Sequence, residues 1–223
     1  MHDTTAPKNQ DAVPDPALST PRRTRSDGRA TRRRILDAAT EEFATHGIAG
    51  ARVDRIAASS GANKARIYAY YGSKEALFDA VLNDNVSAIV DVAPLDATDL
   101  PGYAVALYDA YLTNPPFLRL ATWTRMERRP VGTLFPDGPA LDEPKLAAIA
   151  REQRTGAVSD DFTPGEIHEM VIALALTWSP ISLTTAAAPA DAEREHDRRR
   201  SALRNAVRRA FLTPPTGPAR SSS

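Results

Sequence analysis

The segment 53–77 reads VDRIAASSGANKARIYAYYGSKEAL and predicts two short helices, a tight turn between them and the start of a third helix. In its first part, apolar residues recur at helical spacing up to Gly61, where the left-handed conformation that ends a helix costs least. Asn63 is a good N-cap for the second helix, Gly72 ends that helix, and Ser73 caps the third. The segment therefore indicates a compact helix-turn-helix unit.

The second helix of this unit has only a narrow apolar edge, formed by Ile67 and Tyr71 four residues apart. Its other side chains combine cations, phenols and small groups, which suit phosphate oxygens and base edges of DNA. A merely solvated helix would carry mostly Glu and Lys there. The alternative is an ordinary corner of an all-helical protein, in which Tyr68 and Tyr70 are half-buried packing residues.

The stretch 29–43, RATRRRILDAATEEF, predicts a preceding helix with one apolar face and four arginines crowded at its beginning. Cations at a helix N-terminus oppose the helix dipole and cost roughly a few tenths of a kcal/mol, unless a polyanion lies nearby. DNA would supply that polyanion. The basic start therefore favours a DNA-binding interpretation.

Thirteen residues follow one another in a specific order: a Phe and a Gly at the end of a helix, an Ile-Ala pair, a Gly turn, a Lys, an aliphatic-Tyr pair, an aromatic residue and Ser-Lys-Glu-x-Leu. They are Phe43, Gly47, Ile56, Ala57, Gly61, Lys64, Ile67, Tyr68, Tyr71, Ser73, Lys74, Glu75 and Leu77. In this pattern the first third of the chain, from Arg29 to about Leu82, resembles the N-terminal DNA-binding domain of the TetR family of bacterial transcriptional regulators.

Two positions depart from the family pattern. The family often has a Thr or Ser that caps the helix beginning near Val53, whereas this chain has Ala51 and Arg52 there. We therefore expect that cap to be missing or to come from the backbone or water. Arg66 stands where smaller polar residues are frequent in the family, and this changes the expected base preference.

The resemblance implies a dimer on a palindromic operator in double-stranded DNA, because one recognition helix reads only a few base pairs. We expect Arg66 to contact a base, most naturally guanine, with Ala65 and Ala69 close to bases. Phosphates are the expected partners of most of the remaining candidates. The complete set of predicted DNA-binding residues is Arg32, Arg33, Arg52, Asn63, Lys64, Ala65, Arg66, Tyr68, Ala69, Tyr70 and Lys74.

The resemblance also implies a pocket for a small-molecule effector among the helices of the second domain. Aromatic and apolar residues there weakly indicate an apolar or aromatic effector, and plain core packing is the alternative for each of them. The predicted pocket residues are Tyr103, Leu107, Tyr111, Phe117, Trp123, Met126 and Trp178.

The predicted fold class is all-α, with an N-terminal three-helix DNA-binding domain and a C-terminal helical domain for ligand binding and dimerisation. Near the C-terminus, Thr163 and Glu166 form a capping box at the start of an apolar helix, and another helix covers about 191–212. In the family two such helices from each chain form a four-helix dimer interface; packing within the monomer is the alternative. The predicted boundaries are a disordered tail over 1–28, the DNA-binding domain over 29–76, the effector and dimerisation domain over 77–213, and a second disordered tail over 214–223.

Charge is unevenly distributed along the 223 residues, although the formal net charge is zero. Residues 20–75 hold twelve Arg or Lys against six Asp or Glu, a net +6, so the remainder carries −6. A basic head on an acidic body steers the protein toward a polyanion. Chance asymmetry is the alternative.

Composition excludes several function classes. The chain has no cysteine, which removes disulfides, thiol catalysis and thiolate zinc sites. No stretch approaches the ~20 apolar residues of a membrane span, and no signal peptide is visible, so we expect a cytoplasmic protein. The four histidines are scattered and no catalytic motif is present, so an enzyme is a weaker alternative, as is an adaptor that has lost DNA binding. We expect no cofactor and no metal.

Overall fold

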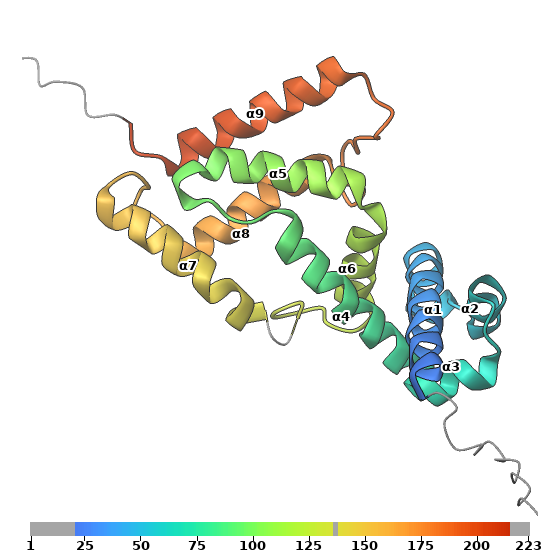
Figure 1. Ribbon diagram of the computed structural model, residues 1–223. Helices are drawn as coiled ribbons and strands as arrows, with labels where there is room; N and C mark the ends of the chain where they lie inside the picture. The colour runs from blue at the N-terminus through green and yellow to red at the C-terminus, as the bar shows by residue number, and fades with distance from the viewer. Residues whose placement is uncertain (1–20, 136–137, 215–223) are drawn as a thin grey trace, which may run out of the picture.

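The computed structural model describes residues 21–135 and 138–214, which form helices around two hydrophobic cores (Figure 1). This confirms the predicted all-α class. The described helices are α1 (Pro21–Gly50), α2 (Val53–Ser60), α3 (Lys64–Tyr71), α4 (Lys74–Val92), the short 3-10 helix η1 (Ala97–Asp99), α5 (Leu100–Thr113), α6 (Pro115–Glu127), α7 (Gly138–Thr155), α8 (Pro164–Ala175), the 3-10 helix η2 (Leu176–Trp178) and α9 (Glu193–Phe211).

The first core holds the N-terminal helices together. Its centre is Phe43 of α1, which is fully buried and meets the ring of Phe78 of α4 edge to face, with ring centroids 5.1 Å apart. The apolar stripe predicted for α2 and the apolar edge predicted for α3 both face this core. It also takes in the first half of α4 and Leu120 of α6, and Trp123 of α6 packs against it, so this core extends beyond residue 76. Its fully buried members are Ile35, Ala39, Phe43, Ile56, Leu77, Phe78, Val81 and Leu120.

Helix α1 begins earlier than the sequence analysis predicted. The expected tail over 1–28 is wrong for residues 21–28, which belong to α1 because Pro21 suits the first helical position and the arginines after it are good helix formers. The cluster Arg29–Arg34 therefore lies beyond the first two turns and does not oppose the dipole at the helix start. The predicted unfavourable interaction with the helix dipole therefore does not apply to Arg29–Arg34. Residues 1–20 and 215–223 of the expected tails lie outside the described residues.

The second core lies between α5, α8 and α9, with α7 against α8 (Figure 1). The predicted capping box at the start of α8 is present: the Thr163 side chain accepts the N–H of Glu166, and the Glu166 carboxylate accepts the N–H of Thr163. One isolated antiparallel bridge joins Val158 to Leu212 beside the end of α9. Among the described residues, no helix combines the length and apolarity that crossing a membrane requires.

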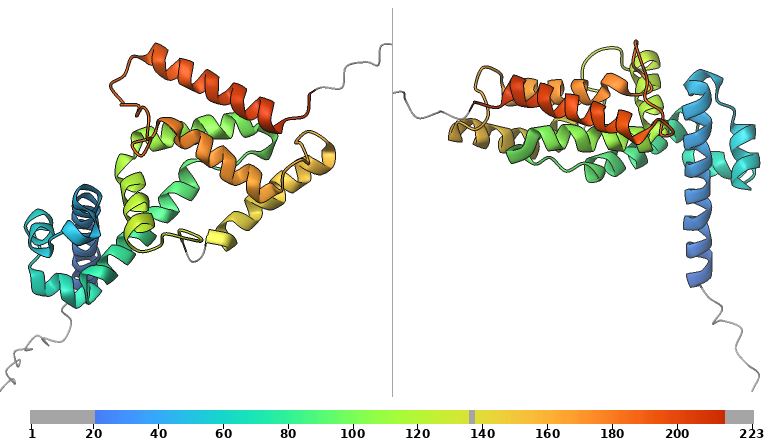
Figure 2. Two further views of the ribbon diagram at one scale, coloured as in Figure 1. Left: turned by 180° about the vertical axis from the view of Figure 1, so that it is seen from behind. Right: turned by 90° about the horizontal axis from the view of Figure 1, so that it is seen from above.

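Helix α6 connects the two cores. Near its start, Phe117 and Leu118 are buried in the second core, whereas Leu120 is buried in the first. Its C-terminal half then reaches the end of α1, where the Trp123 indole N–H donates to the carbonyl oxygen of Ala44 at 3.5 Å. Both views in Figure 2 show α6 running from the body of the second domain to α1. Helix α6 therefore contacts both cores.

Candidate nucleic-acid interface

The turn between α2 and α3 is built by the local signals in the sequence. Gly61 ends α2 with φ 66°, in the left-handed region. Asn63 then caps α3, because its side-chain oxygen accepts the backbone N–H of Arg66 at 2.7 Å. Gly72 ends α3 with φ 80°, and the Ser73 hydroxyl accepts the N–H of Ala76 to begin α4. These caps fix the direction in which α3 leaves the turn.

One side of α3 is buried and the rest is open. Ile67 is the anchor, only 1% exposed, and Tyr71 is half-buried beside it. Six of the predicted DNA-binding residues at this helix are exposed, including Tyr68 at 40%; they are Asn63, Lys64, Ala65, Arg66, Tyr68 and Ala69. We call this set the α3 surface. The α3 surface presents cations, a phenol and small side chains on a helix whose position is fixed by its caps.

The two cations of the α3 surface differ in their partners. Lys64 forms an ion pair with Asp54 of α2 at 3.0 Å, and hydrogen bonding to Asp54 raises the pKa of its ammonium group. Both side chains are more than half exposed, so this pair contributes little and a phosphate can replace Asp54. The Arg66 guanidinium has no hydrogen bond or ion pair to any residue in the part of the chain that the structure describes. Its donors are available to a ligand.

Several other predicted DNA-binding residues have partners within the protein. The Arg33 guanidinium pairs with Asp37 and Asp84. The Lys74 ammonium donates to the carbonyl oxygens of Ala49 and Ala51, at 3.3 and 3.4 Å, and so holds the end of α1. Lys74 therefore has a structural role that the sequence analysis did not predict.

The remaining predicted residues lie beside the α3 surface. The Arg32 guanidinium stacks over the ring of Tyr70, 4.9 Å from its centroid, and Tyr70 is half-buried. Such a cation–π contact fixes both side chains. Arg52 is exposed just before α2. Tyr70 is therefore a half-buried packing residue, as the alternative of an ordinary helical corner predicts. Tyr68 is exposed, which that alternative does not predict.

Helix α2 begins without a side-chain cap, as the sequence predicted for Ala51 and Arg52. The acceptor is instead Glu42 of α1, whose carboxylate accepts the backbone N–H of Arg52 at 2.8 Å. The same carboxylate binds the guanidinium of Arg55 at 2.6 Å. Glu42 is a functional residue that no sequence pattern indicated, although the missing cap is a signal that another acceptor is needed there. This group of contacts, which we call the Glu42 clamp, sets α2 and its turn against α1.

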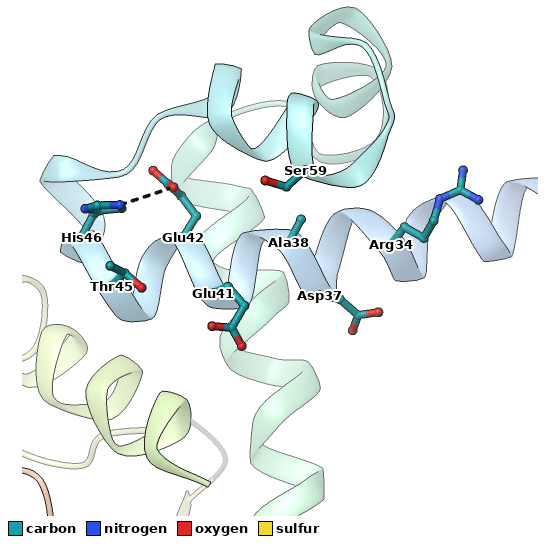
Figure 3. A pocket seen from close by; sticks show the side chains of 8 residues that line it. All are labelled: Arg34, Asp37, Ala38, Glu41, Glu42, Thr45, His46 and Ser59. Carbon is teal, nitrogen blue, oxygen red and sulfur yellow. Dashed lines mark ion pairs between the residues drawn. The ribbon is translucent and has the colours of Figure 1, made fainter.

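The hollow in Figure 3 lies between α1 and α2 on the side of the Glu42 clamp. The dashed line marks the contact between the Glu42 carboxylate and the His46 ring, 3.8 Å apart. Three carboxylates line the hollow, of which Asp37 pairs with Arg33 and Glu42 pairs with Arg55. The lining residues are Arg34, Asp37, Ala38, Glu41, Glu42, Thr45, His46 and Ser59.

The Glu42 clamp predicts a pH dependence. Burial alone raises the pKa of the Glu42 carboxyl, but the hydrogen bonds from Arg55 and from the Arg52 N–H outweigh burial and hold the pKa below its usual value of 4.5. A carboxyl whose pKa is lowered by folding stabilises the protein above its unfolded pKa, and this contribution is lost as the pH falls through the folded pKa. We expect Glu42→Gln to lower the free energy of unfolding by about 1 to 3 kcal/mol at pH 7.

The difference between wild type and Glu42→Gln should shrink as the pH falls from about 5 toward 3. Urea unfolding followed by circular dichroism at each pH measures it. Glu41→Gln, an exposed neighbour on the same helix, is the matched control and should change little. A difference that stays constant down to pH 3 would show that the clamp does not depend on the Glu42 charge.

The predicted effector residues do not all come together. Tyr103, Leu107, Tyr111 and Phe117 are buried in the second core, and Trp178 packs against it. Trp123 instead packs against the first core, and Met126 is 69% exposed, so grouping these two with the others was wrong. The physical reason is that the C-terminal half of α6 leaves the second core to reach α1.

The capped turn, the exposed α3 surface and the larger helical body define a helix-turn-helix protein with a second helical domain. Two family models agree with this description: "Bacterial regulatory proteins, tetR family" matches residues 35–81, and "Tetracyclin repressor-like, C-terminal domain" matches residues 99–209.

Similar proteins point the same way. The HTH-type transcriptional repressor SCO4008 of Streptomyces coelicolor is 39% identical over 159 residues, which cover 70% of this chain and 81% of that protein. The crystal structure of SCO4942 from the same species, described as a transcriptional regulator, is 38% identical with a TM-score of 0.69, and covers 82% of this chain and 99% of its own. This chain therefore belongs to the TetR family of bacterial transcriptional regulators and is a regulator, not an enzyme.

A more distant structure shares the fold alone. A transcriptional regulator from Saccharomonospora viridis, solved in complex with choline, is 18% identical with a TM-score of 0.60 and covers 82% of this chain and 98% of its own.

Proposed function

We propose that this chain is a cytoplasmic transcriptional repressor that binds a palindromic operator as a homodimer and is released from it by a small-molecule effector. The observation that carries the proposal is the α3 surface, in which the Arg66 guanidinium is exposed and has no partner among the described residues. A planar guanidinium in the major groove forms two hydrogen bonds to a guanine. Repression itself is proposed from the likeness to SCO4008, whose name calls it a repressor.

Dimerisation is proposed through α8 and α9. On α9, three exposed alanines follow one another every four residues, at Ala202, Ala206 and Ala210. On α8, Ala173 is exposed and Met170 is half-buried. Small and apolar side chains on two neighbouring helices allow the same surface of a second copy to pack closely around a two-fold axis. A two-fold dimer would present two α3 surfaces to the two halves of a palindrome.

We propose that effector binding in the second domain changes the position of the DNA-binding domain through α6. Pro115 and Phe117, at the start of this helix, lie at the second core, and Glu127 at its end accepts the backbone N–H groups of Ile48 and Ala49. A ligand that shifts the second core would therefore move the end of α1, and with it the spacing of the two α3 surfaces. The ligand can change this spacing only to the extent that it binds one arrangement of the two domains more tightly than another arrangement.

Selection of bound fragments from random duplex DNA tests the function. We expect a palindromic sequence to be recovered, with affinity that falls steeply as salt rises, because phosphate contacts release counterions. Equal affinity for the selected and for random DNA would contradict sequence-specific repression. Binding without salt dependence, or no binding, would support an adaptor that has lost DNA binding.

Replacing Arg66 tests its role in base recognition. We expect Arg66→Ala to reduce the preference for the selected operator over random DNA by about 1 to 3 kcal/mol, because a base contact is lost. Tyr68→Phe should weaken binding to both DNAs alike, because it removes a phosphate contact. Fluorescence anisotropy titrations at one salt concentration measure both. The matched control is Arg154→Ala, which removes an exposed arginine from α7; an equal loss in that variant would exclude base recognition by Arg66.

A further inference from the structure

A second hollow lies beside the α3 surface, where the start of α2 meets α3 and the start of α4. We call it the α2–α4 hollow. Its volume is about 460 Å³, and it opens to solvent, so a phosphate group of a DNA backbone can enter it. Three cations, two carboxylates and one phenol are among its lining residues, which are Arg52, Val53, Asp54, Lys64, Tyr68, Gly72, Ser73, Lys74 and Glu75.

The cation that α3 contributes to the α2–α4 hollow is already paired with a carboxylate. The two carboxylate oxygens of Asp54 lie 3.0 and 3.3 Å from the Lys64 ammonium nitrogen. Hydrogen bonding to Asp54 raises the pKa of Lys64, whereas the nearby positive charge of Arg52 opposes this rise. Asp54 therefore neutralises a site at which two cations lie close together.

The pair between Asp54 and Lys64 can exchange its carboxylate for another anion. The two side chains are 62% and 51% exposed, and an exposed ion pair contributes little because water and salt screen it. A backbone phosphate offers the same kind of oxygen acceptor, and its binding releases counterions from the DNA. The Asp54 carboxylate and a DNA phosphate are therefore alternative partners of one ammonium group.

We propose that Asp54 is an internal competitor of the DNA backbone, whose carboxylate holds Lys64 in the free protein and must be displaced when a phosphate binds there. Asp54 then limits the affinity for every duplex, and its effect requires Lys64. The preference for one sequence over another does not depend on Asp54, because a phosphate contact carries no base information. The inference rests on the proposed function in one respect: the α3 surface is taken to face duplex DNA.

The other carboxylate of the α2–α4 hollow provides a matched comparison. Glu75 is exposed and is the second residue of α4, as Asp54 is the second residue of α2. Glu75 forms no ion pair with any residue in the part of the chain that the structure describes. A general repulsion between carboxylates and DNA would act through both residues, whereas competition for Lys64 acts through Asp54 alone.

Fluorescence anisotropy titrations of the full-length protein with the selected operator and with random duplex DNA test the inference. We expect Asp54→Asn to tighten binding of both DNAs about 2- to 5-fold, because an exposed ion pair no longer has to break. In the Lys64→Met background the same substitution should change neither affinity. Glu75→Gln should have one and the same effect in both backgrounds.

The salt dependence shows whether Lys64 reaches a phosphate at all. We expect Lys64→Met to reduce the slope of affinity against salt concentration, on logarithmic axes, by about 1, since one phosphate contact is lost. An unchanged slope would mean that Lys64 stays with Asp54 in the complex, and this result would overturn the inference.

The inference is also overturned if Asp54→Asn leaves both affinities unchanged, or if it tightens binding equally in the Lys64→Met background, which would indicate general repulsion. A loss of preference for the operator would overturn it too, because the carboxylate would then accept a hydrogen bond from a cytosine amino group. Should circular dichroism show that Asp54→Asn does not fold, Asp54→Gln replaces it, since Gln is a good helix former.

Failure of the proposed function gives a different result. A protein that binds random duplex DNA with this dependence on Asp54 and Lys64, but selects no palindrome, would contradict sequence-specific repression and support the competition. A recovered palindrome without that dependence would do the reverse. Absence of binding to any duplex would overturn both.

Discussion

Replacing Phe43 with alanine is expected to unfold the DNA-binding domain under mild conditions. Phe43 is fully buried and packs edge to face against Phe78, so it links α1 to α4 at the centre of the first core. Truncation of a buried phenylalanine removes its transfer free energy and leaves a cavity, which together cost about 3 to 5 kcal/mol. That is a large part of the stability of a small domain. Operator binding should fall with it, because α3 is positioned by this core.

Unfolding in guanidinium chloride, followed by circular dichroism, measures the loss in free energy of unfolding. Operator affinity is titrated in parallel. Leu183→Ala removes a large apolar side chain that is fully exposed, so its free energy of unfolding should match that of the wild type. Phe43→Leu is a second comparison, because it keeps most of the apolar volume and should cost less than Phe43→Ala. A loss below about 1 kcal/mol in Phe43→Ala would contradict a core centred on this ring.

The helix-turn-helix unit could be predicted because its determinants are local in the sequence. Each cap acts within three residues: Asn63 accepts the N–H of Arg66, and Ser73 accepts the N–H of Ala76. The positive φ at Gly61 needs only the glycine itself. The exposed side of α3 then follows from helical periodicity around one buried anchor. The same reasoning predicted the capping box of α8.

What could not be predicted depends on contacts between distant segments. Glu127 accepts the N–H of Ile48 from 79 positions away, and no periodicity of α6 reveals this. For the same reason Trp123 was grouped with the second core although it packs against the first. Lys74 was expected at phosphates, but its ammonium binds carbonyl oxygens at the end of α1. A side chain's type indicates what it can bind, and only the packing of distant helices decides which partner it meets.

The start of α1 was misjudged for a different reason. Prolines and polar residues before Arg29 predict a disordered tail, but Pro21 fits the first turn of a helix as well as it fits a coil. Composition does not distinguish these two cases when no apolar stripe is present. Because α1 begins at Pro21, the position of Arg29–Arg34 does not favour DNA binding, whereas the exposed α3 surface does.

The contact between the two domains depends on Gly47. This residue has φ 69° and ψ 179°, a conformation that is essentially restricted to glycine, and it turns the end of α1 toward α6. A Cβ atom at this position would lie 2.9 Å from a Glu127 carboxylate oxygen and 3.1 Å from ring atoms of Trp123. Glu127 can shift, but the Trp123 ring is held by its packing. Both backbone strain and a steric clash therefore oppose any side chain at this position.

We expect Gly47→Ala to lower the free energy of unfolding by about 3 kcal/mol, from backbone strain and the clash combined. The strain-only control is Gly132→Ala, because Gly132 also has a positive φ, 73°, but nothing within 4 Å of its Cβ position. Urea unfolding of both variants separates the two contributions. Since the clash forces α6 away from α1, operator binding in Gly47→Ala should also respond less to a ligand of the second domain. Equal losses in Gly47→Ala and Gly132→Ala would mean that the close approach of α6 to α1 does not hold in solution.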